Sequence, residues 1–406
     1  MVSYNNYWAP SSKIEARHQE FIPRSVDVAI IGGGLAGLLM AKFLIDAGIH
    51  NIAVFEESNI GSHASSRSNG FIQFRFSKYF YEIEDTAKAK NYFDFINYNN
   101  SSFINFIKEL DVYCELDAVG GLELAMTNEE FHKLQLETEF LKGVQVSFNP
   151  ILLNHNQVSK ILPNNNFMGG IYNPLQATFN PQRLLSAIFS SLGNRQHKIY
   201  ANAQVEKIEN DVDNASIIFI KNSGVVRAGK VVYCTNAYTS QIVPDLKELI
   251  KPVRGTTIVT DELSSSIIPP YPLTLESGRE SIRSHANRIL HTSLKQQTKN
   301  KPKAHTALLD RQVSAAAFDK LKLELFKKMD KNQIGLDHTW SSVCSETPDG
   351  IPFIGEYRTN QFVLAGFNGY GFSHIYGGVN IIKDLIIKGN TQVPGSKLFN
   401  LQRLGA

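Results

Sequence analysis

Blocks of apolar residues with regular spacing run along the whole chain, and the clearest succession of blocks begins at residue 26. The apolar run over 28–31 predicts a buried strand. Apolar positions at helical spacing then continue to Leu44, and a second apolar run covers 52–55. A strand, a helix and a strand in this order predict a βαβ unit with a parallel sheet.

The same reasoning predicts further elements along the chain. Helices are expected over 79–110, 128–141, 181–192, 315–329 and 375–387. Strands are expected over 121–126, 199–208, 215–220, 225–234, 251–260 and 362–365, and as a pair within 281–293. The mixture predicts an α/β protein, α+β overall, with more than one domain for its 406 residues.

The order of these elements predicts a discontinuous, Rossmann-like nucleotide-binding domain. Its segments would be 26–80, 150–245 and 340–395. A second, substrate-binding domain with an antiparallel sheet and helices would come from 81–149 and 246–339, after a polar arm over 1–25.

A glycine-rich turn, GGGLAG, follows the first strand at residues 32–37. Gly32 permits a tight turn, Gly34 lets the backbone approach a pyrophosphate, and Gly37 lets the helix pack closely on the strand. The following helix offers unpaired N–H groups to phosphate oxygens. A glycine turn that binds nothing is the alternative, but the strand, helix and acid around it favour a nucleotide site.

Glu56 ends the second strand, where a carboxylate accepts hydrogen bonds from ribose hydroxyls. Its charge would repel a 2′-phosphate, so the pattern indicates a dinucleotide of the NAD or FAD type and not NADP.

Composition narrows the range of partners. The chain is 43% hydrophobic and 19% charged, with a net charge of +3, which is too small to indicate nucleic acid binding. The basic cluster within 295–303 lacks interleaved aromatic residues and predicts an exposed loop. The three cysteines have no zinc or disulfide spacing, so no metal site is expected. No secretory signal or membrane span is visible, and we expect a soluble, cytoplasmic protein.

A second glycine cluster, over 366–371, again lies between an apolar strand and a helix. Two such turns far apart in one chain suit a long ligand held at both ends, and FAD is such a ligand. The second turn would then put backbone N–H groups beside the flavin ring, where reduction leaves negative charge. A helix-packing turn is the alternative explanation.

Taken together, these features resemble the D-amino-acid-oxidase-like (DAO-type) FAD-dependent oxidoreductases, and most closely their γ-glutamylputrescine-oxidase-like amine oxidase branch. Besides the two glycine turns and Glu56, the segments that carry the resemblance are NYW at 6–8, GSHASSR at 61–67, GGLELA at 120–125, YCTNAY at 233–238, PVRG at 252–255, Trp340 and TPDGIPFIG at 347–355. They extend along nearly the whole chain.

The resemblance implies a set of FAD contacts. The loop with Ser65, Ser66 and Arg67 would wrap the pyrophosphate and the flavin edge, and Val205 would meet the adenine. The full expected set is Gly32, Gly34, Leu35, Ala36, Gly37, Glu56, Glu57, Ser65, Ser66, Arg67, Val205, Asn236, Gly369, Tyr370, Gly371 and Phe372. On the substrate side, His291, Tyr370 and Tyr238 are the candidate catalytic residues.

Two departures from related enzymes refine the expectation. Glycine oxidase-like members carry a substrate-binding arginine where this chain has Cys344, which favours an amine over an α-amino acid. Another arginine, Arg283 or Arg288, could still take that role. The cysteine that attaches FAD covalently in monomeric sarcosine oxidase falls on Ser342, so non-covalent FAD is expected, with His63 as the remaining attachment candidate.

The resemblance implies oxidation of the C–N bond of a small amine. Hydride would pass to flavin N5, water would hydrolyse the resulting imine, and oxygen or another acceptor would reoxidise the flavin. An amino acid oxidase or dehydrogenase of the same fold is the first alternative. A flavin-binding redox sensor without turnover is the second.

Overall fold

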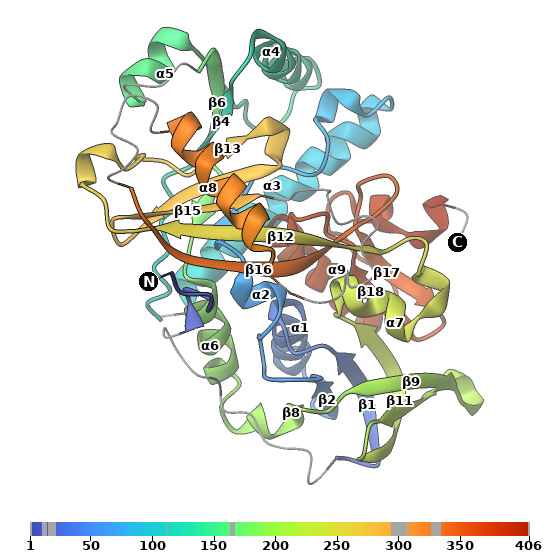
Figure 1. Cartoon of the computed structure of the whole chain (residues 1–406). Helices are drawn as coiled ribbons and strands as arrows, with labels where there is room; N and C mark the ends of the chain where they lie inside the picture. The colour runs from blue at the N-terminus through green and yellow to red at the C-terminus, as the bar shows by residue number, and fades with distance from the viewer. Residues whose placement is uncertain are drawn as a thin grey trace.

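The computed structural model in Figure 1 describes residues 2–9, 14, 22–110, 112–162, 167–293, 307, 309–325 and 334–404. These residues form two eight-stranded sheets, a two-stranded sheet and the helices packed around them. The expected α/β class is therefore confirmed.

The first sheet has the strand order β17-β18-β11-β1-β2-β8, and β10 and β9 extend it from β11. Its strands are β1 (Ser25–Ile31), β2 (Ile52–Phe55), β8 (Ile199–Tyr200), β9 (Val205–Asn210), β10 (Ser216–Ile220), β11 (Gly224–Tyr233), β17 (Phe353–Arg358) and β18 (Gln361–Ala365). Strand β1 lies between β2 and β11 and is parallel to both. Parallel strands with the glycine turn at the carboxyl end of β1 are the arrangement expected of a nucleotide-binding sheet.

The single strand predicted over 199–208 was wrong. The structure has β8 at one edge of the sheet and β9 paired with β10 elsewhere, with a turn between them. Asn202 in this turn has a φ of 55°, a left-handed conformation that interrupts the strand.

Four long helices pack around the first sheet and its neighbours, namely α1 (Leu35–Asp46), α3 (Thr86–Glu109), α6 (Pro181–Ser191) and α9 (Ile375–Lys388). Helix α3 begins at Thr86 and not at residue 79, because the Asp85 side chain accepts a hydrogen bond from the Lys88 N–H and caps the helix. Helix α6 begins with Pro181 after the capping residue Asn180. The other helices are α2 (Ala64–Arg67), α4 (Asn128–Gly143), α5 (His155–Ile161), α7 (Thr239–Ile242) and α8 (Arg311–Leu325).

The second sheet has the order β16-β12-β15-β14-β13-β4-β6-β5 and occupies the upper half of Figure 1. Its strands are β4 (Gly121–Ala125), β5 (Ile151–Asn154), β6 (Gly169–Asn173), β12 (Lys251–Thr260), β13 (Leu273–Leu275), β14 (Glu280–His285), β15 (Arg288–Ser293) and β16 (Leu336–Glu346). Apart from the parallel pair β13–β4, its neighbours run antiparallel.

Sheet membership bears on where the two domains divide. Strands β5 and β6 and most of β16 fall in the segments 150–245 and 340–395 expected for nucleotide binding, yet they pair in the second sheet. Their hydrogen-bonded neighbours are second-domain strands, so we propose that the boundaries lie after β6 and after β16.

The N-terminal arm packs against the rest of the protein. Trp8 is fully buried, and its indole N–H donates to the Ser68 carbonyl at 2.8 Å. The Asn6 side chain donates to the Ser66 carbonyl at 2.9 Å. Two side chains of the arm therefore hold the loop that follows β2.

None of the described helices is long and apolar enough to cross a membrane. The basic cluster within 295–303 and the end of the helix predicted over 315–329 lie outside the described residues.

Candidate functional site

The turn between β1 and α1 has a backbone that only glycine fits. Gly32 has a φ of +105°, and a Cβ there would lie 2.9 Å from the carbonyl oxygen of Cys234. A Cβ on Gly37 would lie 1.9 Å from the carbonyl oxygen of Gly32. The close approach of helix to strand expected from the sequence is thus present.

Glu56 is buried beside this turn and is fixed by backbone donors. One carboxylate oxygen accepts the Gly33 N–H at 2.8 Å, and the other accepts the Ser58 N–H at 3.0 Å. The carboxylate therefore has a defined position at the end of β2, where ribose hydroxyls would approach a bound dinucleotide.

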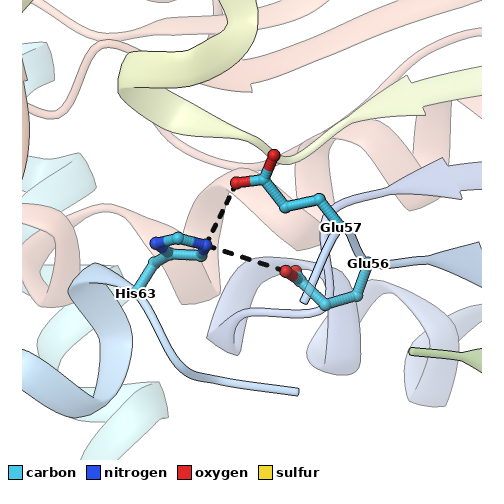
Figure 2. Close-up of side chains that lie close together, drawn as sticks. All are labelled: Glu56, Glu57 and His63. Atoms are coloured by element: carbon cyan, nitrogen blue, oxygen red, sulfur yellow. Dashed lines mark ion pairs between the residues drawn. The ribbon is translucent and has the colours of Figure 1, made fainter. Parts of the chain in front are cut away.

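Figure 2 shows the His63 ring pointing at the carboxylates of Glu56 and Glu57. Its Nε2 atom lies 3.1 Å from Glu57 and 3.9 Å from Glu56. The hydrogen bond between His63 and Glu57 lowers the pKa of Glu57 and raises the pKa of His63. These residue types could ligate a cation, but their contacts with each other and with the backbone explain the group without one.

A cavity of about 330 Å³ opens at this end of the sheet, and we call it the nucleotide-end cavity. Its lining includes Gly32, Gly34, Glu56, Glu57, His63, Val205 and Tyr238. Of the expected FAD contacts, Val205 thus lies with Glu56 although about 150 residues separate them in sequence.

A second cavity, of about 130 Å³, lies at the late glycine cluster, and we call it the flavin-end cavity. Its lining includes Ala36, Gln73, Arg279, Gly369, Tyr370, Gly371 and Phe372. Both cavities are lined by Gly34, Ala64, Ser65, Cys234 and Asn236, so they adjoin at the start of α1. Two adjoining cavities, one at each glycine turn, fit an extended dinucleotide such as FAD.

Asn236 connects the two turns. Its side-chain oxygen accepts the Ser345 hydroxyl at 2.6 Å and the Gly366 N–H at 3.1 Å. The residue itself has a φ of 46°, in the left-handed region that asparagine tolerates. The end of β11 is therefore held against the start of the late glycine turn.

Four of the expected FAD contacts do not line either cavity, namely Leu35, Gly37, Ser66 and Arg67. Arg67 donates from Nε to the Ser62 carbonyl at 3.0 Å and from Nη1 to the Ser341 carbonyl at 3.2 Å. Burial lowers the pKa of its guanidinium. Arg67 thus joins its own loop to β16. Its contact with the cofactor stays a prediction.

His291 was expected on the substrate side, but it faces the other way. It is fully buried and lies 3.2 Å from Glu280, which also pairs with Lys320. Side chains alternate between the two faces of a strand, and it is the next residue, Thr292, that lines the flavin-end cavity. His291 therefore does not line the flavin-end cavity.

The two candidate tyrosines lie in different cavities. Tyr370 lines the flavin-end cavity, and its hydroxyl donates to the Gly278 carbonyl at 2.9 Å. Tyr238 lines only the nucleotide-end cavity, with its ring 5.1 Å from that of His63. Tyr238 thus lies at the nucleotide end, and of the two tyrosines only Tyr370 lines the flavin-end cavity.

The two arginines considered as replacements at the Cys344 position are otherwise engaged. Arg283 donates to the carbonyls of Gly70 and Phe179, and burial lowers its pKa to about 10. Arg288 pairs with Asp337 at 2.6 Å. Cys344 and Ser342 do line the flavin-end cavity, and burial raises the pKa of the Cys344 thiol to about 11.

Sequence reasoning missed several residues of the flavin-end cavity, including Gln73, Arg279, Ser281 and Thr292. Alternation along the predicted strand pair could have identified Ser281 and Thr292, since they are paired across β14 and β15. No sequence pattern marked Gln73 or Arg279, because both lie outside the motifs that carry the resemblance.

The chain is similar to known proteins along most of its length. The family model described as "FAD dependent oxidoreductase" (DAO) matches residues 27–384. Gamma-glutamylputrescine oxidoreductase of Escherichia coli K12 is 23% identical, over 89% of this chain and 83% of that protein. Glycine oxidase of Geobacillus kaustophilus is also 23% identical, over 90% of this chain and 94% of the relative.

Among solved structures, L-proline dehydrogenase from P. horikoshii has the same fold, with a TM-score of 0.80 at 18% identity. The alignment covers 95% of this chain and 99% of that one. Because the family model spans most of the chain and the two cavities fit its cofactor, the protein belongs to the FAD-dependent oxidoreductase (DAO) family, and its cofactor is FAD.

Proposed function

We propose that the protein oxidises the C–N bond of a small amine to an imine, which water then hydrolyses. The observation that carries this proposal is the pair of adjoining cavities, one at each glycine turn. When bound, FAD supplies the acceptor for the two electrons and the hydrogen that leave the substrate carbon.

Different residues of the chain would bind different parts of FAD. The turn at Gly32 and Gly34 would admit the pyrophosphate, and Glu56 would accept from the ribose. The backbone of Gly369 and Gly371 would lie against the flavin ring. Phe367, Phe372 and Ile375, which also line the flavin-end cavity, would exclude water from the reacting atoms.

We propose that FAD is held without a covalent bond. His63 lines the nucleotide-end cavity and is hydrogen-bonded to Glu57, so it lies at the adenosine end of the site. Ser342, at the position of the attaching cysteine of sarcosine oxidase, has no thiol to offer. Neither residue is therefore suited to attach the flavin.

Two measurements on the purified protein test the proposal. We expect a yellow protein whose two-banded flavin absorbance leaves the protein on acid precipitation. We also expect small amines to bleach that absorbance without oxygen. Flavin that stays in the acid pellet would overturn the non-covalent assignment, and flavin that no amine or amino acid bleaches would favour a redox sensor.

Oxidation of an amino acid is the second candidate, and one observation favours it. Arg279 lines the flavin-end cavity, where it could pair with a carboxylate.

A further inference from the structure

The flavin-end cavity has an uneven charge. Among the described residues that line it, Arg279 is the one charged side chain, and the remainder are glycines, apolar residues and neutral polar residues. A single cation in a cavity without a carboxylate attracts an anionic group on whatever enters.

Arg279 is available to bind a ligand. Its side chain is exposed at the cavity, and no ion pair or side-chain hydrogen bond of Arg279 occurs within the described part of the chain. The neighbouring group that senses its charge is the Tyr370 hydroxyl. The other arginines considered above, Arg283 and Arg288, already have partners.

The turn that carries Arg279 is strained. Glu276 and Ser277 have φ angles of 49° and 54°, and Gly278 follows with a φ of 91°. Two successive non-glycine residues in the left-handed region are uncommon, and such strain persists only where the surroundings hold it.

Two buried side chains hold this turn. Arg75 donates to the Ser277 carbonyl and pairs with Glu123 at 2.6 Å, and Tyr370 donates to the Gly278 carbonyl at 2.9 Å. A Cβ on Gly278 would lie 2.1 Å from the Arg75 side chain, so the turn packs directly on this pair. The position of Arg279 at the cavity is therefore fixed by Arg75 and Tyr370, of which Tyr370 also lines the flavin-end cavity.

Gln73 provides a second feature of the same cavity. Its side chain is more than nine-tenths buried, and its Oε1 atom has no hydrogen-bond partner although the residue lines the cavity. A buried acceptor without a donor is costly, so this oxygen is suited to an N–H group that arrives with a ligand.

We propose that Arg279 binds a carboxylate of the substrate and that Gln73 accepts an N–H of the reacting amine, so that the substrate is an amine that also carries a carboxylate. This inference rests on the proposed C–N oxidation. The residue that binds the substrate carboxylate would then lie in the turn before β14, and not at the strand position of Cys344, where glycine oxidase-like members carry their arginine. The positive guanidinium also disfavours the ammonium form of the bound amine, which helps present the neutral form that reacts.

The test compares wild-type holoenzyme with the Arg279→Gln and Arg279→Lys variants. Arg24→Gln, which alters an exposed arginine away from both cavities, is the matched control. The substrates are matched pairs that differ by a carboxylate, such as N-methylglycine with dimethylamine and 4-aminobutyrate with propylamine. Initial rates with an added electron acceptor give kcat/KM for each, anaerobic bleaching shows whether each compound reduces the flavin, and benzoate titrated against the flavin spectrum measures carboxylate binding without turnover.

We expect wild type and the control to prefer the carboxylate-bearing member of each pair. Arg279→Gln should weaken benzoate binding and that preference by roughly 10- to 100-fold, and Arg279→Lys by less, because lysine keeps the charge but not the fork of donors. Activity on the amines without carboxylate should fall much less, because those amines lose only the effect of the guanidinium on their ammonium form. The inference would be overturned if Arg279→Gln kept both the preference for carboxylate-bearing substrates and the benzoate affinity within about twofold of wild type.

Gln73→Leu separates the second contact from the first. It should lower kcat/KM for both members of a pair alike and leave benzoate affinity unchanged, because it removes only the amine acceptor. If Gln73→Leu matches wild type on both members, Gln73 has no role in binding the amine. If no compound bleaches the flavin of any of these proteins, C–N oxidation fails, and the benzoate titration still decides the role of Arg279.

Discussion

At the scale of single residues, Glu56 combines two roles. It accepts the backbone N–H groups of Gly33 and Ser58, and so it fixes the glycine turn before any ligand arrives. The same carboxylate lines the nucleotide-end cavity. We therefore expect that preorganisation of the turn and recognition of the ribose depend on one buried side chain.

We expect Glu56→Gln to bind FAD roughly tenfold more weakly, since an amide replaces one of the two charged acceptors. Titration of the apoprotein with FAD, followed by quenching of flavin fluorescence, measures the change. Glu129→Gln is the control, because Glu129 is exposed, pairs with Lys133 and lines neither cavity. Equal affinity in wild type and Glu56→Gln would contradict the proposed ribose contact.

His374 gives the late glycine turn a dependence on pH. It is buried between the Tyr92 hydroxyl and the Tyr370 carbonyl, each 2.8 Å away, and burial lowers its pKa to about 4. The unfolded chain therefore binds a proton near pH 6 that the folded chain does not. The contribution of His374 to stability is complete above pH 6.5 and is lost as the pH falls towards 4.

The unfolding free energy of the apoprotein should fall between pH 6.5 and 4.5 by up to about 1.4 kcal/mol per pH unit through this histidine. Urea unfolding at several pH values measures the slope. His374→Gln should flatten it, because glutamine can bond to both neighbours without titrating. An equally steep slope in the variant would show that other groups cause it.

At the scale of elements, the N-terminal arm is part of the cofactor site's support. Trp8 and Asn6 bond to the carbonyls of Ser68 and Ser66, in the loop whose Ser65 and Ala64 line both cavities. The Trp8 ring also packs against His285 and lies near the Arg283 guanidinium. The arm therefore links the loop after β2 to the second sheet.

Replacing Trp8 with alanine should destabilise the protein by about 3–5 kcal/mol, because the change leaves a cavity at a fully buried site. It should also weaken FAD binding, since the loop loses its anchor. Thermal unfolding and an FAD titration measure the two effects. Trp8→Phe, which keeps an aromatic ring, should lose less stability and less FAD affinity. An unchanged FAD affinity in Trp8→Ala would show that the loop keeps its conformation without Trp8.

Strands β14 and β15 show what sequence could and could not predict at this scale. The apolar pattern predicted a pair of strands within 281–293, and the structure has them. Which side chains of a strand face the cavity depends on the elements that pack against each face of the sheet. Those elements come from residues that are distant in sequence. For that reason His291 was assigned to the wrong face, although its neighbour Thr292 lines the cavity.

At the scale of the whole molecule, the two adjoining cavities are lined by parts of the chain that are far apart, so FAD bound there should stabilise the entire fold. FAD at about 100 times its Kd should add about 2.7 kcal/mol to the unfolding free energy. A thermal shift of the apoprotein measures this gain. NADP should give no shift, because Glu56 repels its 2′-phosphate, and an equal shift with NADP would contradict the assignment of the site.

The glycine turns were predictable because their chemistry is local, since strand, turn and helix are adjacent in sequence. The flavin-end cavity was predictable only in part. Gln73 and Arg279 both line it because the loop after β3 (Phe71–Ile72) lies against the turn before β14, where Arg75 of the loop donates to the Ser277 carbonyl. Contacts between segments about 200 residues apart leave no pattern in a single sequence.

The strand order of the first sheet also sets when the site can exist. Val28 of β1 pairs with Lys230 of β11, about 200 residues later, and β18 joins only near residue 361. At roughly 5–20 residues per second, a ribosome needs on the order of 10–40 s between the synthesis of β1 and that of β11. The first glycine turn is therefore synthesised well before β11, its neighbour in the sheet. A nascent chain cannot form the complete FAD site until the late glycine turn has also been synthesised.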